Sequence, residues 1–456
     1  MVLQTSSLVF TVRRHPPELV APAKPTSHEL KVLSEIDDQN GLRYQLPLVQ
    51  FFPYQASMAG KDPVEVIRKA LSKTLVFYYP FAGRLRECPN GKLMVDCNGE
   101  GVMFIEADAD VTIQQFGNNF MPPFPSFDEL LYNVPGSDGI TDCPLLLIQV
   151  TRVKCGGFIF GLRMNHVMCD GSGICQFMKG LSEIAEGAAK PSILPGWHRE
   201  ILCARDPPRV TCIHHEYQQL PPDSRSIFTP HHRSFFFGPK EIASLCALLP
   251  QRLAAKSTSF EIITACLWRC RTASLQWPNP NQELRLLCIV NARFGTCRFN
   301  PPLPTGFYGN AFVFPAAVTT VGELLNRPLG FALELIKKAK NEANEEYVHS
   351  VADLMAMKGR PCFTRLGSFM VSDLTKSGFT DVYFGWGKPL YFGVAKGGLG
   401  DIPGVSFYVP YTNSKGEKGR VIPICLPEDA MERFDKELDH TLNIMNNTIP
   451  VLKSNL

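Results

Sequence analysis

A histidine and an aspartate four residues apart, His166 and Asp170, have the types and spacing that acid–base chemistry needs. An imidazole with a reference pKa of about 6.5 can take a proton from a hydroxyl near neutral pH, provided that another group fixes its tautomer and position. Two fixed positions also occur often by chance, and a packed histidine beside a turn aspartate leaves the same pattern. The surrounding elements must discriminate between these interpretations.

Two apolar, β-prone runs precede the histidine. Residues 145–153 (LLLIQVTRV) and 157–163 are predicted strands, joined by a glycine-bearing link of hairpin length. After Asp170, a Gly-Ser-Gly turn opens a segment whose apolar residues recur on one helical face and which stops at Gly187. We therefore expect His166 at a strand end and Asp170 on a strand-to-helix turn, where a backbone can aim a side chain into a cleft.

The composition is that of a globular protein with a sizeable core. The chain has 456 residues, of which 45% are apolar and 20% charged, and this length suffices for two domains of ordinary size. No run approaches the roughly 18 uninterrupted apolar residues of a membrane-spanning helix. The net charge of +3 and the lack of a dense Lys/Arg block argue against nucleic acid as a partner.

The 15 cysteines are odd in number, scattered and without a C-x-x-C pair, which indicates reduced thiols in a reducing compartment. Cys266 and Cys270 lie one helical turn apart but in an apolar segment, so we expect no metal site there. The last three residues, Ser454, Asn455 and Leu456, loosely resemble the S-K-L peroxisomal signal. We expect a cytoplasmic location, with the peroxisome as the alternative.

A predicted helix start in the second half of the chain also has chemical meaning. Residues 258–261 (TSFE) have the spacing of a capping box, and an apolar helical segment follows. The free N–H groups and the dipole at a helix N-terminus favour a phosphate, and Lys256 lies two residues upstream. A cap with an unrelated surface lysine explains the same residues.

Residues 188–233 are rich in Pro, Arg and His and have little periodicity, which is typical of a long crossover. We therefore predict an N-terminal domain over residues 1–187 that carries the H-x-x-x-D pattern. The crossover takes residues 188–233, and a C-terminal domain takes residues 234–456.

Five segments extend the pattern along the chain, in this order: HVMCD (166–170), the helix segment 258–271, VNAR (290–293), PPLPTGFYGN (301–310) and YFGWG (383–387). Together they resemble the plant BAHD acyltransferases, which use acyl-CoA donors, and the match runs almost end to end. The resemblance implies an α/β (α+β) fold of two chloramphenicol-acetyltransferase-like domains, each a mixed β-sheet flanked by helices, with a solvent tunnel between them. The sequence of the N-terminal part is most similar to those of alcohol acyltransferases that make benzyl benzoate and volatile esters.

The resemblance also implies roles for single residues. His166 would be the general base, reached from both ends of the tunnel, and Asp170 would turn away to pair with Arg293. The indole N–H of Trp386 would stabilise the oxyanion. The CoA phosphates and pantetheine would meet three residues at the helix start, Lys256, Ser257 and Ser259.

Two further features of the sequence concern the motif loop and the acceptor. The family's D-F-G-W-G reads YFGWG here, with Tyr383 in place of the acid and Asp381 as a candidate substitute for it. The predicted strand 46–52 presents Leu46, Leu48 and Gln50 on one face, where hydroxycinnamoyl transferases carry hydroxyl-bearing residues. An apolar face suits an apolar alcohol, because unpaired polar groups there would raise the cost of binding.

The function implied by the resemblance is acyl transfer, most directly from benzoyl-CoA to benzyl alcohol. Acyl-CoA is a co-substrate, so we expect no metal and no other cofactor. We also expect a monomer. An acetyl-CoA-dependent transferase for aliphatic alcohols such as hexenol needs the same residues, so the sequence does not separate the two. A CoA-binding protein without turnover is the non-enzyme alternative. The presence of His166, Asp170, Arg293 and Trp386 weighs against it.

Overall fold

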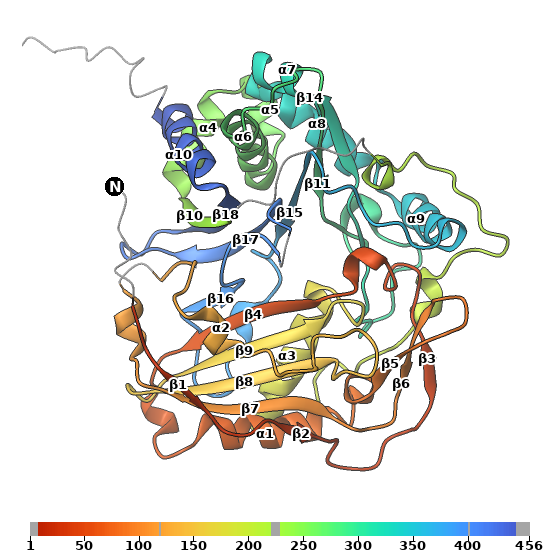
Figure 1. Cartoon of the computed structure of the whole chain (residues 1–456), viewed down its shortest axis with the longest axis vertical. Coiled ribbons are helices and arrows are strands. Elements are labelled where there is room, and N and C mark those ends of the chain that lie inside the picture. The colour runs from red at the N-terminus through yellow and green to blue at the C-terminus, as the bar shows by residue number, and fades with distance from the viewer. Residues whose placement is uncertain (1–7, 118–119, 220–228, 400–401, 444–456) are drawn as a thin grey trace, which may run out of the picture.

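Two mixed β-sheets, one built mainly from each half of the chain, form the frame of the protein (Figure 1). The computed structural model describes residues 8–117, 120–219, 229–399 and 402–443. Both sheets contain parallel and antiparallel neighbours and are flanked by helices. The predicted α/β class is therefore confirmed.

The first sheet has the strand order β1-β7-β8-β9-β4-β16, with β2 also paired to β7. Its strands are β1 (Val12–Arg14), β2 (Glu18–Val20), β4 (Gln45–Phe52), β7 (Val102–Ala109), β8 (Leu146–Val153), β9 (Phe158–Asn165) and β16 (Tyr391–Gly393). Strands β8 and β9 form the predicted hairpin, although β9 continues two residues further than expected.

Helices α1 (Pro63–Thr74) and α3 (Gly171–Ala185) belong to this half and pack against each other. Each begins directly after a capping aspartate. The Asp62 side chain accepts a hydrogen bond from the Val64 N–H at 3.1 Å, and proline at the first helical position fits its fixed φ. Helix α3 begins with Asp170 as its N-cap, so the H-x-x-x-D segment joins the end of β9 to the start of α3.

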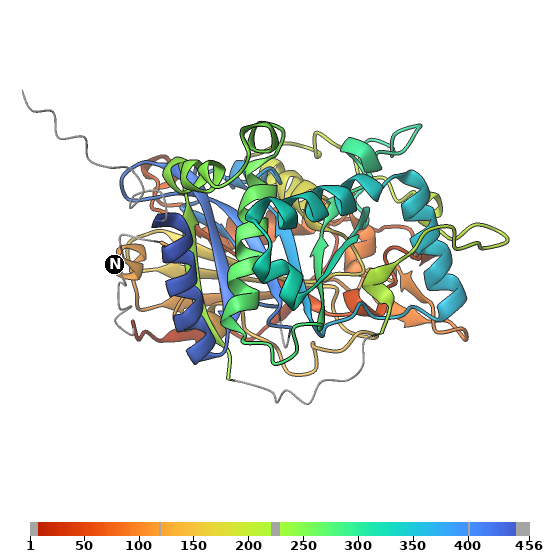
Figure 2. The ribbon, with the colours of Figure 1, turned by 90° about the horizontal axis from the view of Figure 1, so that it is seen from above.

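The second sheet has the order β10-β18-β17-β15-β11-β14. These strands are β10 (His231–Phe237), β11 (Glu283–Cys288), β14 (Ala316–Thr320), β15 (Ser368–Asp373), β17 (Val405–Thr412) and β18 (Lys418–Leu426). Figure 2 shows α6 (Ser259–Ser274), α8 (Leu329–Glu342) and α10 (Glu428–Asn443) side by side over it. The other helices of this half are α4 (Pro239–Ala247), α5 (Gln251–Ala255), α7 (Val321–Asn326) and α9 (Glu345–Lys358).

One strand crosses between the halves. β16 comes from the C-terminal half, yet its residues Tyr391–Gly393 pair with Val49, Gln50 and Phe51 of β4 (Figure 1). A division into residues 1–187, 188–233 and 234–456 does not include this exchange, and those domain bounds stay a prediction. The exchange fixes the second half against the strand that also pairs with β9.

The remaining elements are small. β3 (Leu30–Val32), β5 (Arg84–Glu87) and β6 (Leu93–Asp96) form a three-stranded sheet, β12 (Val290–Asn291) pairs with β13 (Phe312–Val313), and α2 (Phe127–Leu130) is a single turn. None of the helices in the described ranges combines the length and apolarity that a membrane span requires. Within the same ranges, no group of three or more His, Cys, Asp or Glu side chains is placed to hold a metal ion.

Candidate active site

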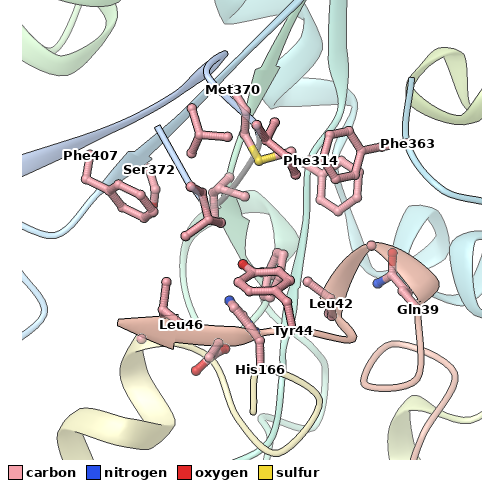
Figure 3. Close-up of a pocket in the computed structure, with 18 of the residues that line it drawn as sticks. Gln39, Leu42, Tyr44, Leu46, His166, Phe314, Phe363, Met370, Ser372 and Phe407 are labelled. Carbon is pink, nitrogen blue, oxygen red and sulfur yellow. The ribbon is translucent and has the colours of Figure 1, made fainter. Parts of the chain in front are cut away.

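A cavity of about 110 Å³ lies where the two halves meet (Figure 3). Tyr44, Leu46 and His166 line it from the first half, and Phe312 and Met370 line it from the second. Most of its wall is apolar, and the few polar side chains on it include His166 and Tyr44. The histidine singled out from the sequence is therefore exposed to an internal space and is not sealed within the core.

The backbone of His166 is held from two sides. Its N–H donates to the carbonyl of Tyr44 at 2.9 Å, just beyond the last β4–β9 pair, Gln45 with Asn165. Its own carbonyl accepts a hydrogen bond from Asn310 Nδ2 at 2.8 Å. Both groups of its peptide backbone are thus satisfied by neighbours, which leaves the ring as the part of the residue available for chemistry.

The environment of the ring favours the neutral imidazole. Burial lowers the pKa of His166 from 6.5, and the carboxylates of Asp170 and Asp37 oppose this shift without cancelling it. Nδ1 is enclosed and has no hydrogen-bond partner among the described residues, so Nε2 is the nitrogen left to face the cavity. A neutral ring with one nitrogen open to a cavity is what a general base requires.

The Asp170 carboxylate stabilises the turn through its hydrogen bonds. Its Oδ1 accepts from the Gly173 N–H at 2.9 Å, which caps α3. Its Oδ2 accepts from Arg293 Nη1 at 2.6 Å and from the Ala311 N–H at 3.0 Å. With both oxygens engaged, the carboxylate supports the loop that carries His166, and the sequence-based pairing of Asp170 with Arg293 is present in the structure.

Two buried charges that the sequence analysis did not single out hold the same loop. Arg199 Nη2 donates to the carbonyl of Met168 at 2.7 Å, and Arg199 Nη1 lies 3.1 Å from Asp37 Oδ1. The same Asp37 oxygen accepts from Asn310 Nδ2 at 2.9 Å. A β-carbon at Gly309 would overlap the Arg199 guanidinium, so the glycine before Asn310 leaves the room that this ion pair occupies.

Comparison with known proteins agrees with this arrangement. Residues 10–441 match the sequence model of the Transferase family. The chain belongs to this family, the BAHD acyltransferases. It is 61% identical over 446 residues to a benzyl alcohol O-benzoyltransferase of Nicotiana tabacum, with 97% of this chain and 96% of the relative covered.

Two other comparisons widen this result. A 13-hydroxylupanine O-tigloyltransferase of Lupinus albus is 63% identical over 442 residues, covering 96% of both chains. The crystal structure of vinorine synthase superposes with a TM-score of 0.73 at 21% identity and covers 94% of this chain and 98% of its own. The structural match shows that the two-domain BAHD fold is shared.

Of the three residues expected on the acceptor side in this BAHD chain, two line the cavity and one does not. Leu46 and Leu48 line it, as expected. Gln50 lies on the same face of β4 but deeper, where it is 1% exposed and its Nε2 donates to the Phe379 carbonyl at 3.2 Å. The structure therefore brings the two leucines to His166 and places the glutamine beneath Phe379, outside the cavity wall.

Trp386 lies well away from His166. Its ring packs edge-on against Phe158, with centroids 5.3 Å apart. Phe158 begins β9, seven residues before Asn165, which at roughly 3.3 Å per residue is about 23 Å along the strand. The structure does not bring the indole to the cavity, and its role at the oxyanion stays a prediction.

The motif loop around Trp386 is held by α3 without the family's acid. Ser182 Oγ accepts from the N–H groups of Tyr383 and Phe384 at 3.0 and 2.9 Å. Asp381 lies 3.7 Å from Lys179 of α3. The aspartate two residues upstream of Tyr383 thus makes an ion pair with the helix that begins at the active-site turn.

The three expected CoA-binding residues cluster at the start of α6. Lys256 is exposed, and Ser257 and Ser259 are half-buried. Lys337 of α8 donates to the Lys256 carbonyl and to Ser257 Oγ, the latter at 3.1 Å. Lys340, one helical turn further along α8, lies 2.6 Å from Glu261. The α8 lysines, which sequence reasoning missed, add positive charge beside the helix N-terminus.

A second cavity, of about 500 Å³, adjoins the first at the start of α3. Asp170 and Gly171 line the first cavity, and Ser172 lines the second. The second cavity has a more polar wall that includes Lys179 and Lys376. The turn between His166 and α3 therefore separates an apolar cavity from a more polar one that carries lysines.

Proposed function

We propose that this chain is an acyl-CoA-dependent O-acyltransferase that forms esters from small apolar alcohols, with benzoyl-CoA and benzyl alcohol as its substrates. The observation that carries the proposal is His166, a neutral imidazole with one ring nitrogen facing an apolar cavity between the two halves. Membership of the BAHD family supports the acyl-CoA donor. The relative from Nicotiana tabacum supports the acceptor and acyl class.

The reaction needs one proton carrier. His166 takes the alcohol proton as the alcohol oxygen attacks the thioester carbonyl carbon, and the carbonyl electron pair moves onto its oxygen. When the tetrahedral intermediate collapses, the C=O bond forms again and the C–S bond breaks. The proton on His166 passes to the CoA thiolate, which leaves as a thiol. Both substrates meet in one site, so no acyl-enzyme is required and proximity supplies much of the rate.

The apolar wall supports an apolar acyl group and alcohol. Leu46, Leu48, Phe312 and Met370 line the same cavity as His166. Figure 3 shows Leu46 and Met370 on its wall. Gln39, a polar lining residue, uses its amide to donate to the Ile36 carbonyl and to accept from Tyr217. Moving an aromatic ring from water into such a site costs little free energy. A polyhydroxylated acceptor would leave hydroxyls there without hydrogen-bond partners.

The CoA end is proposed at the start of α6. Free N–H groups and the dipole of this 16-residue helix attract a phosphate, and Lys256, Ser257 and Ser259 supply charge and hydroxyls there. The nearby lysines of α8 increase the positive electrostatic potential at the start of α6. The second cavity carries Lys179 and Lys376 on its wall and lies beside the turn between His166 and α3, and it is the proposed path of the CoA arm to the base.

A second candidate differs in both substrates. The 63% identity to a 13-hydroxylupanine O-tigloyltransferase supports tigloyl-CoA with a bulkier, nitrogen-containing alcohol. An acetyl-CoA-dependent enzyme for hexenol-type alcohols and a CoA-binding protein without turnover remain alternatives from the sequence. All four share the site residues and differ in what is turned over.

The deciding experiment incubates pure full-length protein with benzoyl-, tigloyl- and acetyl-CoA, each with benzyl alcohol, 13-hydroxylupanine and hexenol. Esters are detected by mass and released CoA by its thiol. The proposal expects the highest kcat/KM for benzoyl-CoA with benzyl alcohol. A preference for either other pair would replace the proposed substrates, and no thiol release with any pair would support CoA binding alone.

The oligomeric state and the cellular location of the protein are also proposals. We propose that it acts as a monomer, the state expected from the resemblance to the BAHD acyltransferases. The proposed location is cytoplasmic or peroxisomal. The tripeptide Ser454, Asn455 and Leu456, which suggests the peroxisome, lies outside the described residues.

A further inference from the structure

The oxyanion that forms in the proposed reaction needs a hydrogen-bond donor close to His166, because the base and the attacked carbonyl must lie within a few ångströms of each other. Trp386, the donor implied by the family resemblance, packs against Phe158 near the far end of β9. A donor on the cavity wall itself is therefore required. The described lining residues offer few side chains for this purpose.

Most polar groups on the wall are already occupied. Gln39 is bonded to Ile36 and Tyr217, and both oxygens of Asp170 accept hydrogen bonds from the protein. Two hydroxyls remain, those of Tyr44 and Ser372, for which the described residues provide no hydrogen-bond partner. These two hydroxyls differ in their position relative to the base.

Tyr44 lies against His166. Its ring centroid is 5.5 Å from that of the imidazole, with 58° between the planes, and its carbonyl accepts the His166 N–H. Figure 3 shows its ring directly beside the imidazole, whereas Ser372 lies across the cavity near Phe407. The backbone hydrogen bond and the ring contact fix the phenol in place next to the base.

Most enclosed tyrosine hydroxyls in the described residues have a protein partner: those of Tyr78, Tyr217, Tyr347, Tyr391 and Tyr408 bond to Gln176, Gln39, Glu216, the Val394 carbonyl and Thr264, respectively. The hydroxyl of Tyr308, which is 2% exposed, also has no protein partner among these residues, but Tyr308 does not line the cavity. Burial raises the pKa of the Tyr44 hydroxyl above its usual value of 10, so it keeps its proton wherever His166 is neutral. A hydroxyl on a cavity wall without a protein partner is available to a bound ligand.

We propose that the Tyr44 hydroxyl donates a hydrogen bond to the thioester carbonyl oxygen and stabilises the negative charge that develops there. This inference rests on the proposed acyl transfer. Tyr44 then acts on the carbonyl oxygen while His166 acts on the alcohol proton. The phenol keeps its own proton throughout, so the electron and proton balance of the reaction is unchanged.

The test compares Tyr44→Phe with wild type, using two alcohols that the wild type esterifies with one acyl-CoA. Removing one oxyanion donor lowers kcat by about 10²–10³-fold. The loss should be the same for both alcohols, because the hydroxyl contacts the acyl carbonyl and not the acceptor. The KM values should stay within about threefold and the melting temperature within about 2 °C, because no protein group loses a partner.

Tyr54→Phe is the matched control, since it removes the same hydroxyl from a side chain that is 54% exposed, and it should behave as wild type. An unchanged kcat in Tyr44→Phe would overturn the proposal, as would a loss seen only as a raised alcohol KM, or a loss in Ser372→Ala instead. Wild-type protein that forms no ester would refute the proposed function itself, which separates the two failures.

Discussion

Arg293 Nη1 lies 2.6 Å from Asp170 Oδ2, and this ion pair joins the turn that carries His166 to the second half of the chain. Arg293 also donates to the Gly309 carbonyl at 2.6 Å, next to Asn310, which bonds to the carbonyl of His166. The turn that carries His166 is therefore fixed by residues from both halves. Its charged support is buried, which makes it costly to disturb.

Asp170→Asn should lower stability and activity together. The amide keeps the shape of the side chain but leaves the Arg293 cation without its charge partner, so we expect a loss of about 3–5 kcal/mol in the free energy of unfolding. Urea unfolding measures this loss. The control is Asp429→Asn, which removes the charge of an exposed partner of Arg433 and should leave the unfolding curve close to that of wild type. Full stability with lost turnover in Asp170→Asn would instead indicate a direct chemical role.

The pH dependence should report the lowered pKa of His166. Because the neutral ring is the base, kcat/KM should rise with pH through a pKa below 6.5 and be level at neutral pH. A pH profile of kcat/KM with both substrates below saturation measures this limb, because it reports the free enzyme. An acid limb centred above 6.5 would contradict the burial of the ring.

The same shift has a defined effect on stability. The folded ring binds its proton less tightly than the unfolded one, so its contribution is fully present above the unfolded pKa of 6.5. It is lost as pH falls from 6.5 towards the folded pKa. Chemical unfolding of wild type and His166→Gln across this window should show the pH-dependent difference, and parallel curves would contradict it.

Lys337→Ala should weaken acyl-CoA binding alone. The substitution removes a cation that contacts Lys256 and Ser257 at the start of α6. We expect the acyl-CoA KM to rise about tenfold, the worth of one charge-assisted hydrogen bond, and the rise to shrink as salt increases. Lys436→Ala, at an exposed site on α10, is the control. An equal rise in the alcohol KM would place the lysine's effect elsewhere.

The local parts of this site follow from the sequence because local rules determine them. Apolar, β-prone runs and turn residues located β8 and β9, and helical periodicity after the Gly-Ser-Gly turn located α3. The side of β4 that faces the cavity also followed from alternation. How far the cavity extends along that strand did not, and so Gln50 was expected on its wall and lies beneath Phe379.

The long-range contacts that hold the turn could not be predicted from the sequence. Arg199 and Asn310 contact carbonyls of the 166–170 segment from 31 and 144 residues away, and no spacing rule connects such positions. The crossing of β16 to pair with β4 is equally non-local. Tyr44 was missed for a different reason, because a single tyrosine before a strand carries no signal until its neighbours are known.

The most direct test of the whole account is ester formation by His166→Ala. The variant should bind acyl-CoA as tightly as wild type, because the ring faces the reacting atoms, and its kcat should fall by about 10²–10⁴-fold, the typical worth of a general base. Single-turnover ester formation and acyl-CoA titration on the same protein measure the two quantities. Unchanged turnover in a folded variant would remove His166 from the mechanism and contradict the account.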